Sequence, residues 1–552
     1  MKATLRNGLL LVGTLGVFGC GGGADIDAGG GLGATPGGEQ DVALLRESVA
    51  RGVVPVAAAM TVPGFLAEHD LPLEAPVCTQ VLCISAGVGV ARAIDTGKNE
   101  VFVQLGFSSG LEAATFERDP LNLMAVVDRS GSMHGEKMEA AKTALHKLVD
   151  QLGPEDRFGI IIFDDKFDIL VEPAAVTNRA ALHTKVSSIT DRNATDIESA
   201  LRRGFELVRA GTSATRRDRV ILMTDAQPNT GRTGTMEFQN LVNQYAAEGV
   251  GLTALGVGID FGQELALAIT HARGGNYFFL RDRAKIETVF DRDFDFLVTP
   301  LAYDLHMVLR AAVGYRIKEV YGLPASPEGS TVVLDAATLF LSRNRGAILL
   351  RMEPSGDWGD GRLLAETELS YETAEASMGG ERVTQQLSAG YGGEAALGAD
   401  TVWFSQRGVE RTVAIVNAAV AVRRGLELYH QGQRSQGAAE VDKARSALLT
   451  AAGADALNAD LRTDATLCER LAGLMRGTTV GPQPTSSPQP STSPRPSTSP
   501  QPGAQPDEDE PYRLYGCSAS AGAGDAGRTG AGAALLLAAI ILARVLSRRR
   551  AR

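Results

Sequence analysis

Five oxygen-bearing side chains in three separate segments have the types and spacing of a divalent-cation site. Asp128, Ser130 and Ser132 stand at alternate positions in one segment, and Thr195 and Asp225 occur in two later ones. Mg²⁺ prefers oxygen ligands in a near-octahedral array and keeps several of its waters, so few protein charges beside neutral hydroxyls suit it. The sequence therefore predicts a site for Mg²⁺, or for the similar ion Mn²⁺, at these five residues.

Two apolar strands are expected to position these side chains. Residues 123–127 form a short apolar run typical of a strand buried on both faces, and Asp128 follows it directly. Residues 220–224 form a second such strand before Asp225, and Thr195 precedes a helical pattern. In an open α/β sheet, ligands bind outside the carboxyl ends of the strands, so we expect the five side chains to meet there.

Capping and turn formation are the alternative explanation for each residue taken singly, because Ser, Thr and Asp are common at turns and helix N-termini. Their joint occurrence, in three segments and at predicted strand ends, favours the metal site. Asp164, Asp165 and Asp168 form another acidic cluster at a predicted hairpin. Hairpin tips are commonly acidic because they are solvated, so we assign no second metal to them.

The order of these motifs resembles the metal-ion-dependent adhesion site of the von Willebrand factor A (VWA) domain family, over about residues 119–298. The resemblance implies that Ser130, Ser132 and Thr195 bind the metal directly, while the two aspartates act largely through water. It also implies that a carboxylate from a partner protein completes the coordination shell. The chain departs from the family where Asn193-Ala194 replaces a common Gly-Gly before the threonine.

The same region alternates predicted strands and helices, which indicates a doubly wound, Rossmann-like α/β domain. We expect strands at 123–127, 157–163, 220–225, 251–257 and 276–280, with 167–171 antiparallel to its neighbour, and helices at 137–152, 179–189, 196–209, 236–248, 262–272 and 285–297.

Catalytic and nucleotide-binding motifs are not apparent. His134 lies near Ser132, but the neighbouring sequence contains no orienting partner and no nucleophile, both of which a general base requires. The pair Gly97-Lys98 lacks the Ser or Thr that a phosphate-binding loop needs. Around Ser130, an aspartate stands where a nucleophile elbow needs glycine. We therefore expect that the protein is not an enzyme.

The N-terminal residues have the features of an export signal. Lys2 and Arg6 precede an apolar run within residues 1–19, and Cys20 follows at once. This junction resembles a bacterial lipobox, in which Cys20 would carry the lipid; export without lipidation is the alternative. Residues 20–45 are Gly-rich and are expected to form a flexible linker.

The C-terminal residues have the features of a spacer and an anchor. Residues 477–511 are rich in Pro, Ser and Thr, which predicts an extended disordered linker. In residues 512–552, Cys517 precedes an apolar run at 530–546 and an arginine cluster. This arrangement resembles the C-terminal sorting signal of myxobacterial surface proteins, in which the tail is processed at the cysteine. A plain transmembrane anchor with cytoplasmic arginines is the alternative.

Short alternating strands flank the central domain on both sides. We predict an N-terminal β region at 46–118 and an antiparallel β-sandwich at 299–375, with the upstream strands joining the same sheets. This layout resembles bacterial secreted proteins related to inter-alpha-trypsin inhibitor heavy chains and calcium-activated chloride channel regulators. Residues 400–476 have apolar helical spacing and are predicted to form a small bundle, in which partner binding is the alternative to packing.

The cysteines separate into different classes. Cys78 and Cys83 are close together, and a local disulfide is the favoured pairing in an exported chain. Zinc is disfavoured because no second Cys or His pair follows at ligand spacing. Cys468 lies in the helical region without a reactive context, which favours an ordinary buried or unpaired thiol.

Composition narrows the function further. The 552 residues carry 54 Lys and Arg against 65 Asp and Glu, a formal net charge of -11, which argues against a nucleic-acid partner. Three functions remain: a surface adhesion or protein-binding module that captures a partner's Asp or Glu at the metal, an envelope scaffold that self-associates through the same site, and a metal-assisted hydrolase. The hydrolase is disfavoured because no base or nucleophile accompanies the metal.

Overall fold

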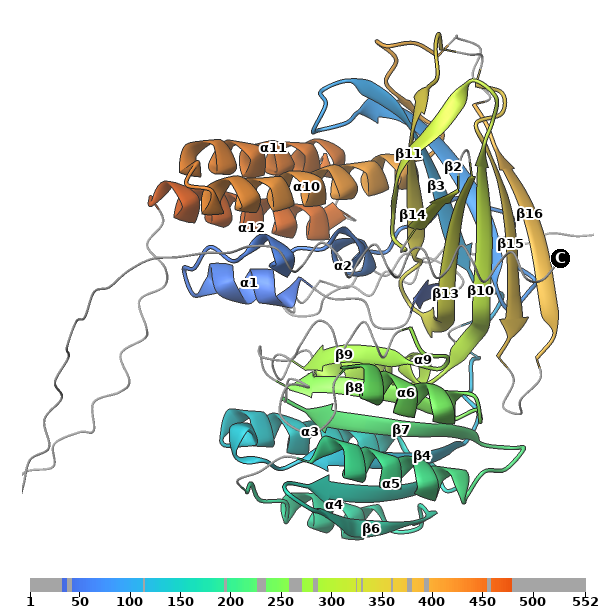
Figure 1. Ribbon diagram of the computed structural model, residues 1–552, viewed down its shortest axis with the longest axis vertical. Helices are drawn as coiled ribbons and strands as arrows, with labels where there is room; N and C mark the ends of the chain where they lie inside the picture. Colours follow the sequence, from blue (N-terminus) through green and yellow to red (C-terminus); the bar gives the residue numbers. More distant parts are fainter. Residues whose placement is uncertain are drawn as a thin grey trace, which may run out of the picture. The chain divides into compact units, whose positions relative to one another are not determined.

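The computed structural model describes residues 32–36, 42–112, 115–192, 196–225, 235–257, 271–280, 286–323, 325–328, 331–358, 361–374, 380–391, 397–453 and 458–478 (Figure 1). The export signal with Cys20, the loop with Thr195 and residues 262–270 of a predicted helix lie outside these ranges. The C-terminal spacer and anchor, with Cys517, lie outside them from residue 479 onward. Among the described helices, none combines the length and apolar character needed to cross a membrane.

The central domain is built on a six-stranded mixed sheet in the order β6-β5-β4-β7-β8-β9. Five strands run parallel, and β6 is antiparallel to β5, as the sequence predicted. Strand β4 is central and every residue in it is buried, which fits its apolar sequence. The strands are β4 (Leu121–Asp128), β5 (Arg157–Phe163), β6 (Phe167–Ala175), β7 (Arg217–Thr224), β8 (Gly251–Val257) and β9 (Asn276–Leu280).

Helices cover both faces of this sheet, so the predicted doubly wound α/β fold is confirmed (Figure 1). One face packs against α3 (Glu136–Gln151), α4 (Arg179–Ser187) and α9 (Phe294–Leu297), and the other against α5 (Ile197–Arg209) and α6 (Thr235–Ala246). Helix α5 buries Ile197, Ala200, Leu201 and Phe205, the spacing of a single helix face.

The last helix of this domain differs from the prediction. The sequence predicts one continuous helix at 285–297, but a π-helical turn at Thr288–Arg292 separates the first residues from α9. Phe290 and Phe294 are both buried there, with ring centroids 6.2 Å apart. The two residues are four positions apart, one in the π-helical turn and one in α9, and their rings face the same core.

Two antiparallel sheets form the predicted sandwich, and the strands before and after the central domain share them. The first sheet has the order β1-β13-β10-β15-β16, with β12 also on β13, and the second has the order β11-β14-β3-β2-β17. The strands are β1 (Gly33–Pro36), β2 (Cys83–Arg92), β3 (Asn99–Ser108), β10 (Pro300–Ala311), β11 (Tyr315–Tyr321), β12 (Ala325–Glu328), β13 (Thr331–Ser342), β14 (Ala347–Pro354), β15 (Ala365–Thr373), β16 (Arg382–Ala389) and β17 (Trp403–Phe404).

Two expectations for the N-terminal part are wrong. The stretch predicted as flexible linker contains β1, which pairs with the end of β13 and buries Leu32 and Ala34. The region predicted as short strands begins with two helices and a 3-10 turn, α1 (Ala43–Ala50), η1 (Ala57–Ala59) and α2 (Val62–Ala67). Buried residues on α1 and at its N-cap, Val42, Leu45 and Val49, follow a helical period that short-strand spacing does not explain.

The predicted helical bundle consists of α10 (Arg407–His430), α11 (Arg434–Ala452) and α12 (Ala459–Arg476). It shares one hydrophobic core with α1, α2 and the outer face of the second sheet, where Phe102 and Leu349 are buried. Cys468 is a buried free thiol in this core, and burial raises its pKa to about 12. The apolar stripes of the bundle are therefore packing faces.

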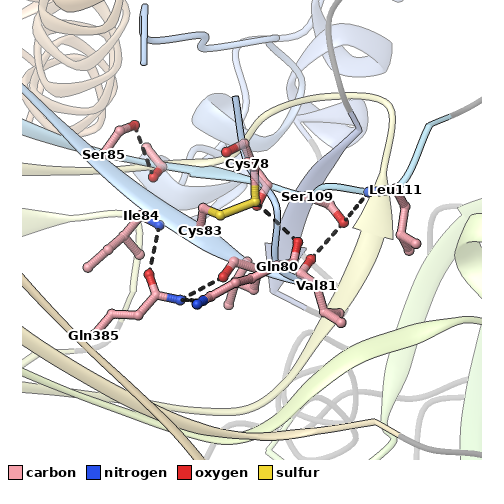
Figure 2. Close-up of a disulfide and its surroundings, with 12 residues drawn as sticks. Cys78, Gln80, Val81, Cys83, Ile84, Ser85, Ser109, Leu111 and Gln385 are labelled. Atoms are coloured by element: carbon pink, nitrogen blue, oxygen red, sulfur yellow. Dashed lines mark hydrogen bonds between the residues drawn. A yellow bond between two sulfur atoms is a disulfide. The ribbon is translucent and has the colours of Figure 1, made fainter. Parts of the chain in front are cut away.

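Cys78 and Cys83 form a disulfide beside the start of β2 (Figure 2). The loop that it closes is held by Gln385 of β16, whose Nε2 donates to the carbonyl of Leu82 at 2.7 Å. The same Gln385 accepts from the backbone N–H of Ile84 at 3.3 Å. Because β2 and β16 belong to different sheets, these bonds connect the two layers at this end of the sandwich.

A buried histidine links the N-terminal helices to the bundle. His69 follows α2; its Nδ1 lies 2.7 Å from Asp460 Oδ2 and its Nε2 lies 3.1 Å from Asp464 Oδ2. Arg46 of α1 pairs with Asp464 at 2.8 Å, and Arg411 of α10 pairs with Asp460. Burial by itself lowers the pKa of His69, but its contacts with the two carboxylates outweigh burial and raise the pKa above its usual value.

We predict that His69→Gln destabilises the protein by about 1–3 kcal/mol at pH 6, because it leaves buried carboxylate oxygens unpaired. Since the pKa of His69 is raised by folding, its stabilising effect is complete below the unfolded pKa of about 6.5 and is lost as pH rises through the folded value. Urea unfolding at pH 6 and pH 9 should show the larger wild-type advantage at pH 6. The exposed pair His306–Asp335 supplies the control, His306→Gln; an equal loss at both pH values would contradict the prediction.

Candidate metal centre

Asp128 is the buried end of the candidate site. It is the last residue of β4, and its side chain is fully buried. Its Oδ1 accepts from the backbone N–H of Ser130 at 2.8 Å, and its Oδ2 accepts from the hydroxyl of Thr224 at 2.5 Å. These bonds fix the rotamer of the carboxylate, so its position is determined before any ion binds.

Hydroxyl groups connect this buried end to solvent. Ser130 is buried, and its Oγ lies 3.1 Å from the Oγ of Ser132, which is exposed. Ser132 Oγ in turn donates to Asp225 Oδ1 at 2.8 Å. The first two hydroxyls belong to the turn after β4, which contains the short 3-10 helix η2 (Gly131–Met133), and Asp225 follows β7. Four of the five predicted residues are therefore brought together at the carboxyl ends of two neighbouring parallel strands.

A lysine that the sequence pattern did not single out offsets part of the negative charge. Lys137, in the first turn of α3, places its Nζ 2.6 Å from Asp225 Oδ2. The Asp225 side chain is only 1% exposed, so its charge needs a nearby counterion. Two carboxylates and one ammonium give this cluster a net charge of -1.

Thr224 is the other functional residue that sequence reasoning missed. Strands β4 and β7 are parallel, with Val127 opposite Met223, so Thr224 comes next to Asp128 across the ladder. Its position directly before Asp225 was a usable signal. Recognising it required the strand register, which the sequence did not specify.

The surrounding loops support the site without adding ligands. Arg129 is nearly buried and pairs with Asp164 and Asp168, each at 2.7 Å. The acidic cluster at the β5–β6 hairpin therefore balances this arginine. His134 is 80% exposed and its Nδ1 lies 3.0 Å from Asp191, another exposed residue of the rim.

These residues fit a hard divalent cation. Every available donor is an oxygen, and only two carry formal charge, which leaves room for bound water. Within the described ranges, no three His, Cys, Asp or Glu side chains form a ready metal cluster. That finding concerns a different donor set, because this site combines two carboxylates with serine hydroxyls.

Burial raises the pKa of Asp128 above its usual range. The hydrogen bonds from Ser130 and Thr224 act in the opposite direction, and repulsion by Asp225 adds to the increase. Without a metal, the ionised form of Asp128 is therefore less stable in the folded domain than in water. A bound cation would relieve that cost.

Comparison with known proteins agrees with this architecture. Residues 122–292 match the model of the von Willebrand factor type A domain, so the chain contains such a domain. Human inter-alpha-trypsin inhibitor heavy chain H4 is 30% identical over 194 residues, covering 32% of this chain and 20% of that protein. An uncharacterized protein of Synechocystis sp. is 26% identical over 221 residues, covering 40% and 52%. The chain thus spans between a fifth and about half of these relatives.

The chain was also compared with solved structures. The von Willebrand factor type A protein from Catenulispora acidiphila matches with a TM-score of 0.43 and 16% identity. The match covers 69% of this chain and 88% of that one.

We predict that Asp128→Asn stabilises the metal-free protein at pH 7 by about 1 kcal/mol, the usual scale for one buried polar group. A carboxyl group whose pKa is raised by folding contributes stability below its unfolded pKa of about 3.9 and loses it as pH rises. The amide of Asn does not ionise, so the Asp128→Asn variant avoids this loss of stability. Its stability advantage over wild type should therefore shrink as pH falls toward about 4. Urea unfolding in EDTA at both pH values tests this; a variant less stable than wild type at pH 7 would contradict it.

Proposed function

We propose that the VWA domain of this chain is a divalent-metal-dependent protein-binding module that captures a partner's Asp or Glu on the bacterial cell surface. Ser130 and Ser132 would bind Mg²⁺ or Mn²⁺ directly, with Thr195 as a third direct ligand. Asp128 and Asp225 would act mainly through bound water. When bound, the ion supplies an electrophilic coordination position for an external carboxylate.

The observation that carries this proposal is the line of oxygen donors from buried Asp128 to exposed Ser132. A cation held there would contact protein on one side and solvent on the other. Because Lys137 already neutralises part of the acidic charge, a divalent ion would leave the cluster with a net positive charge. A positive, solvent-facing ion attracts a carboxylate more strongly than one held by several protein carboxylates.

Surface display is proposed from the two ends of the sequence. The export signal and Cys20 suggest anchoring at the N-terminus, while Cys517 and the apolar run at 530–546 suggest anchoring at the C-terminus. The Pro-rich spacer would hold the folded part away from a C-terminal anchor.

The binding test compares full-length protein with Mg²⁺, with EDTA, and with Asp128→Ala. We expect capture of a partner from envelope extract only for wild type with Mg²⁺, and we expect a soluble Asp-containing peptide to reduce it. Asp165→Ala removes an exposed carboxylate from the neighbouring hairpin and should bind normally. Capture that persists in EDTA, with circular dichroism unchanged, would refute metal dependence.

Analytical ultracentrifugation of the purified protein separates this proposal from its alternative. A sedimentation coefficient that increases only with Mg²⁺ would indicate self-association through the same site, as an envelope scaffold requires. We expect no such increase at concentrations where the partner is captured.

We predict that Lys137→Met raises the affinity for Mg²⁺ about tenfold, or about 1.4 kcal/mol, because it removes a positive charge beside Asp225. The same change should weaken capture of the partner's carboxylate, since the bound ion becomes less electrophilic. Titration calorimetry with Mg²⁺ measures the first effect and partner binding the second. Lys142→Met, which removes a lysine paired with Glu139 further along α3, is the matched control. Unchanged Mg²⁺ affinity in Lys137→Met would contradict this assignment.

A further inference from the structure

Two histidines outside the candidate site face each other across neighbouring helices. His146 lies on α3 and His183 on α4, and their Nδ1 atoms are 2.8 Å apart. Their ring centroids are 5.0 Å apart, so the two nitrogens point toward each other along the line between the rings. One Nδ1 must carry a proton and the other a lone pair in this arrangement.

The outer nitrogens have partners of their own. His183 Nε2 lies 3.0 Å from Asp150 Oδ1, and His146 Nε2 lies 3.4 Å from the hydroxyl of Ser187. A carboxylate only accepts, so the proton of neutral His183 sits on Nε2 and its Nδ1 presents the lone pair. Metal-binding histidines are oriented in this way, with the second ring nitrogen donating to a carboxylate.

We propose that His146 and His183 form a second metal site, which takes a borderline transition ion such as Zn²⁺, Ni²⁺ or Cu²⁺. The ion would bind both Nδ1 atoms and complete its shell with water. The proton on His146 Nδ1 would move through solvent to Nε2, and this N–H would donate a hydrogen bond to the Ser187 hydroxyl oxygen. Both rings stay neutral, so the exchange releases no net proton from the pair.

The required movement is small. With Zn–N bonds of about 2.0–2.1 Å, a tetrahedral ion holds two nitrogens roughly 3.3 Å apart. The Nδ1 atoms must therefore separate by roughly half an ångström from their present 2.8 Å. Helix α4 has nine residues and Val186 is its one fully buried side chain, so it can adjust without disrupting the core.

Charged side chains of both signs lie near the histidine pair. Asp150 and Glu139 bring negative charge toward His146, whereas Lys142 opposes it. Lys142 is itself paired with Glu139 at 3.3 Å, which limits its effect. A bound ion would fasten α4 to α3, in the segment that leads to Asp191 at the rim of the first site.

Donor chemistry separates the two sites. Imidazole nitrogens suit Zn²⁺, Ni²⁺ and Cu²⁺, whereas the oxygen donors around Asp128 suit Mg²⁺ and Mn²⁺. Excess Mg²⁺ should therefore leave the histidine site free for Zn²⁺. The proposal does not depend on the function proposed for the oxygen site.

Calorimetric titration of the full-length protein with Zn²⁺ in excess Mg²⁺ tests this inference. We expect one binding step that weakens at least tenfold in His146→Ala and in His183→Ala. Asp128→Ala and His306→Ala should retain it, since they alter the oxygen site and an unrelated exposed histidine. Co²⁺ absorption gives a second reading, as histidine coordination changes the visible spectrum.

Circular dichroism and the urea unfolding midpoint establish that the histidine variants remain folded, and His146→Gln provides a milder replacement. If both folded variants bind Zn²⁺ and Co²⁺ as wild type does, the pair shares only a proton and the inference is overturned. Binding that disappears with Asp128→Ala but survives in the histidine variants would also overturn it.

Discussion

Two acidic side chains, Asp128 and Asp225, are buried at the ends of adjacent parallel strands, and this placement constrains the central domain. Burial removes the water that would otherwise stabilise both charges, and their proximity adds repulsion. Neighbouring hydrogen-bond donors and one ammonium group partly offset this cost. The Ser130 N–H and the Thr224 hydroxyl serve one carboxylate, while Ser132 and Lys137 serve the other.

In the function proposed above, that arrangement would exchange stability for the capacity to hold a cation. A core built for stability alone would replace the buried carboxylate with an uncharged side chain. Retaining it keeps the carboxylate oxygens fixed in position, so a bound cation would require little reorganisation. The hydrogen bonds of the metal-free site therefore both limit the cost of the buried charges and set the geometry of the donors.

The rest of the described chain is assembled from segments distant in sequence. Strands β2 and β3 precede the VWA domain, yet they pair with β14 and β17, which follow it. The N-terminal helices pack with the C-terminal bundle in one core, and His69 joins them through Asp460 and Asp464. The central domain is thus an insertion between two halves of a sandwich. The chain enters it from a strand of the sandwich and returns from it to another strand of the same sandwich.

Much of this could be predicted from the sequence because the signal was local. Apolar runs defined β4, β5 and β8, and alternation defined β11. The spacing of Asp128, Ser130 and Ser132 indicated a metal site, and strand-end position added Asp225. The helices before residue 68 and strand β1 were missed. Segments this short take their structure largely from the partners they pack against.

By itself, the sequence determined which residue types could bind a cation and at which strand ends they stand. Tertiary structure alone decided that Thr224 faces Asp128, that Lys137 neutralises Asp225 and that His146 meets His183. Each of these contacts depends on strand register or on the packing of one helix against another. Such relations join residues far apart in the chain, and no local pattern of hydrophobicity or spacing encodes them.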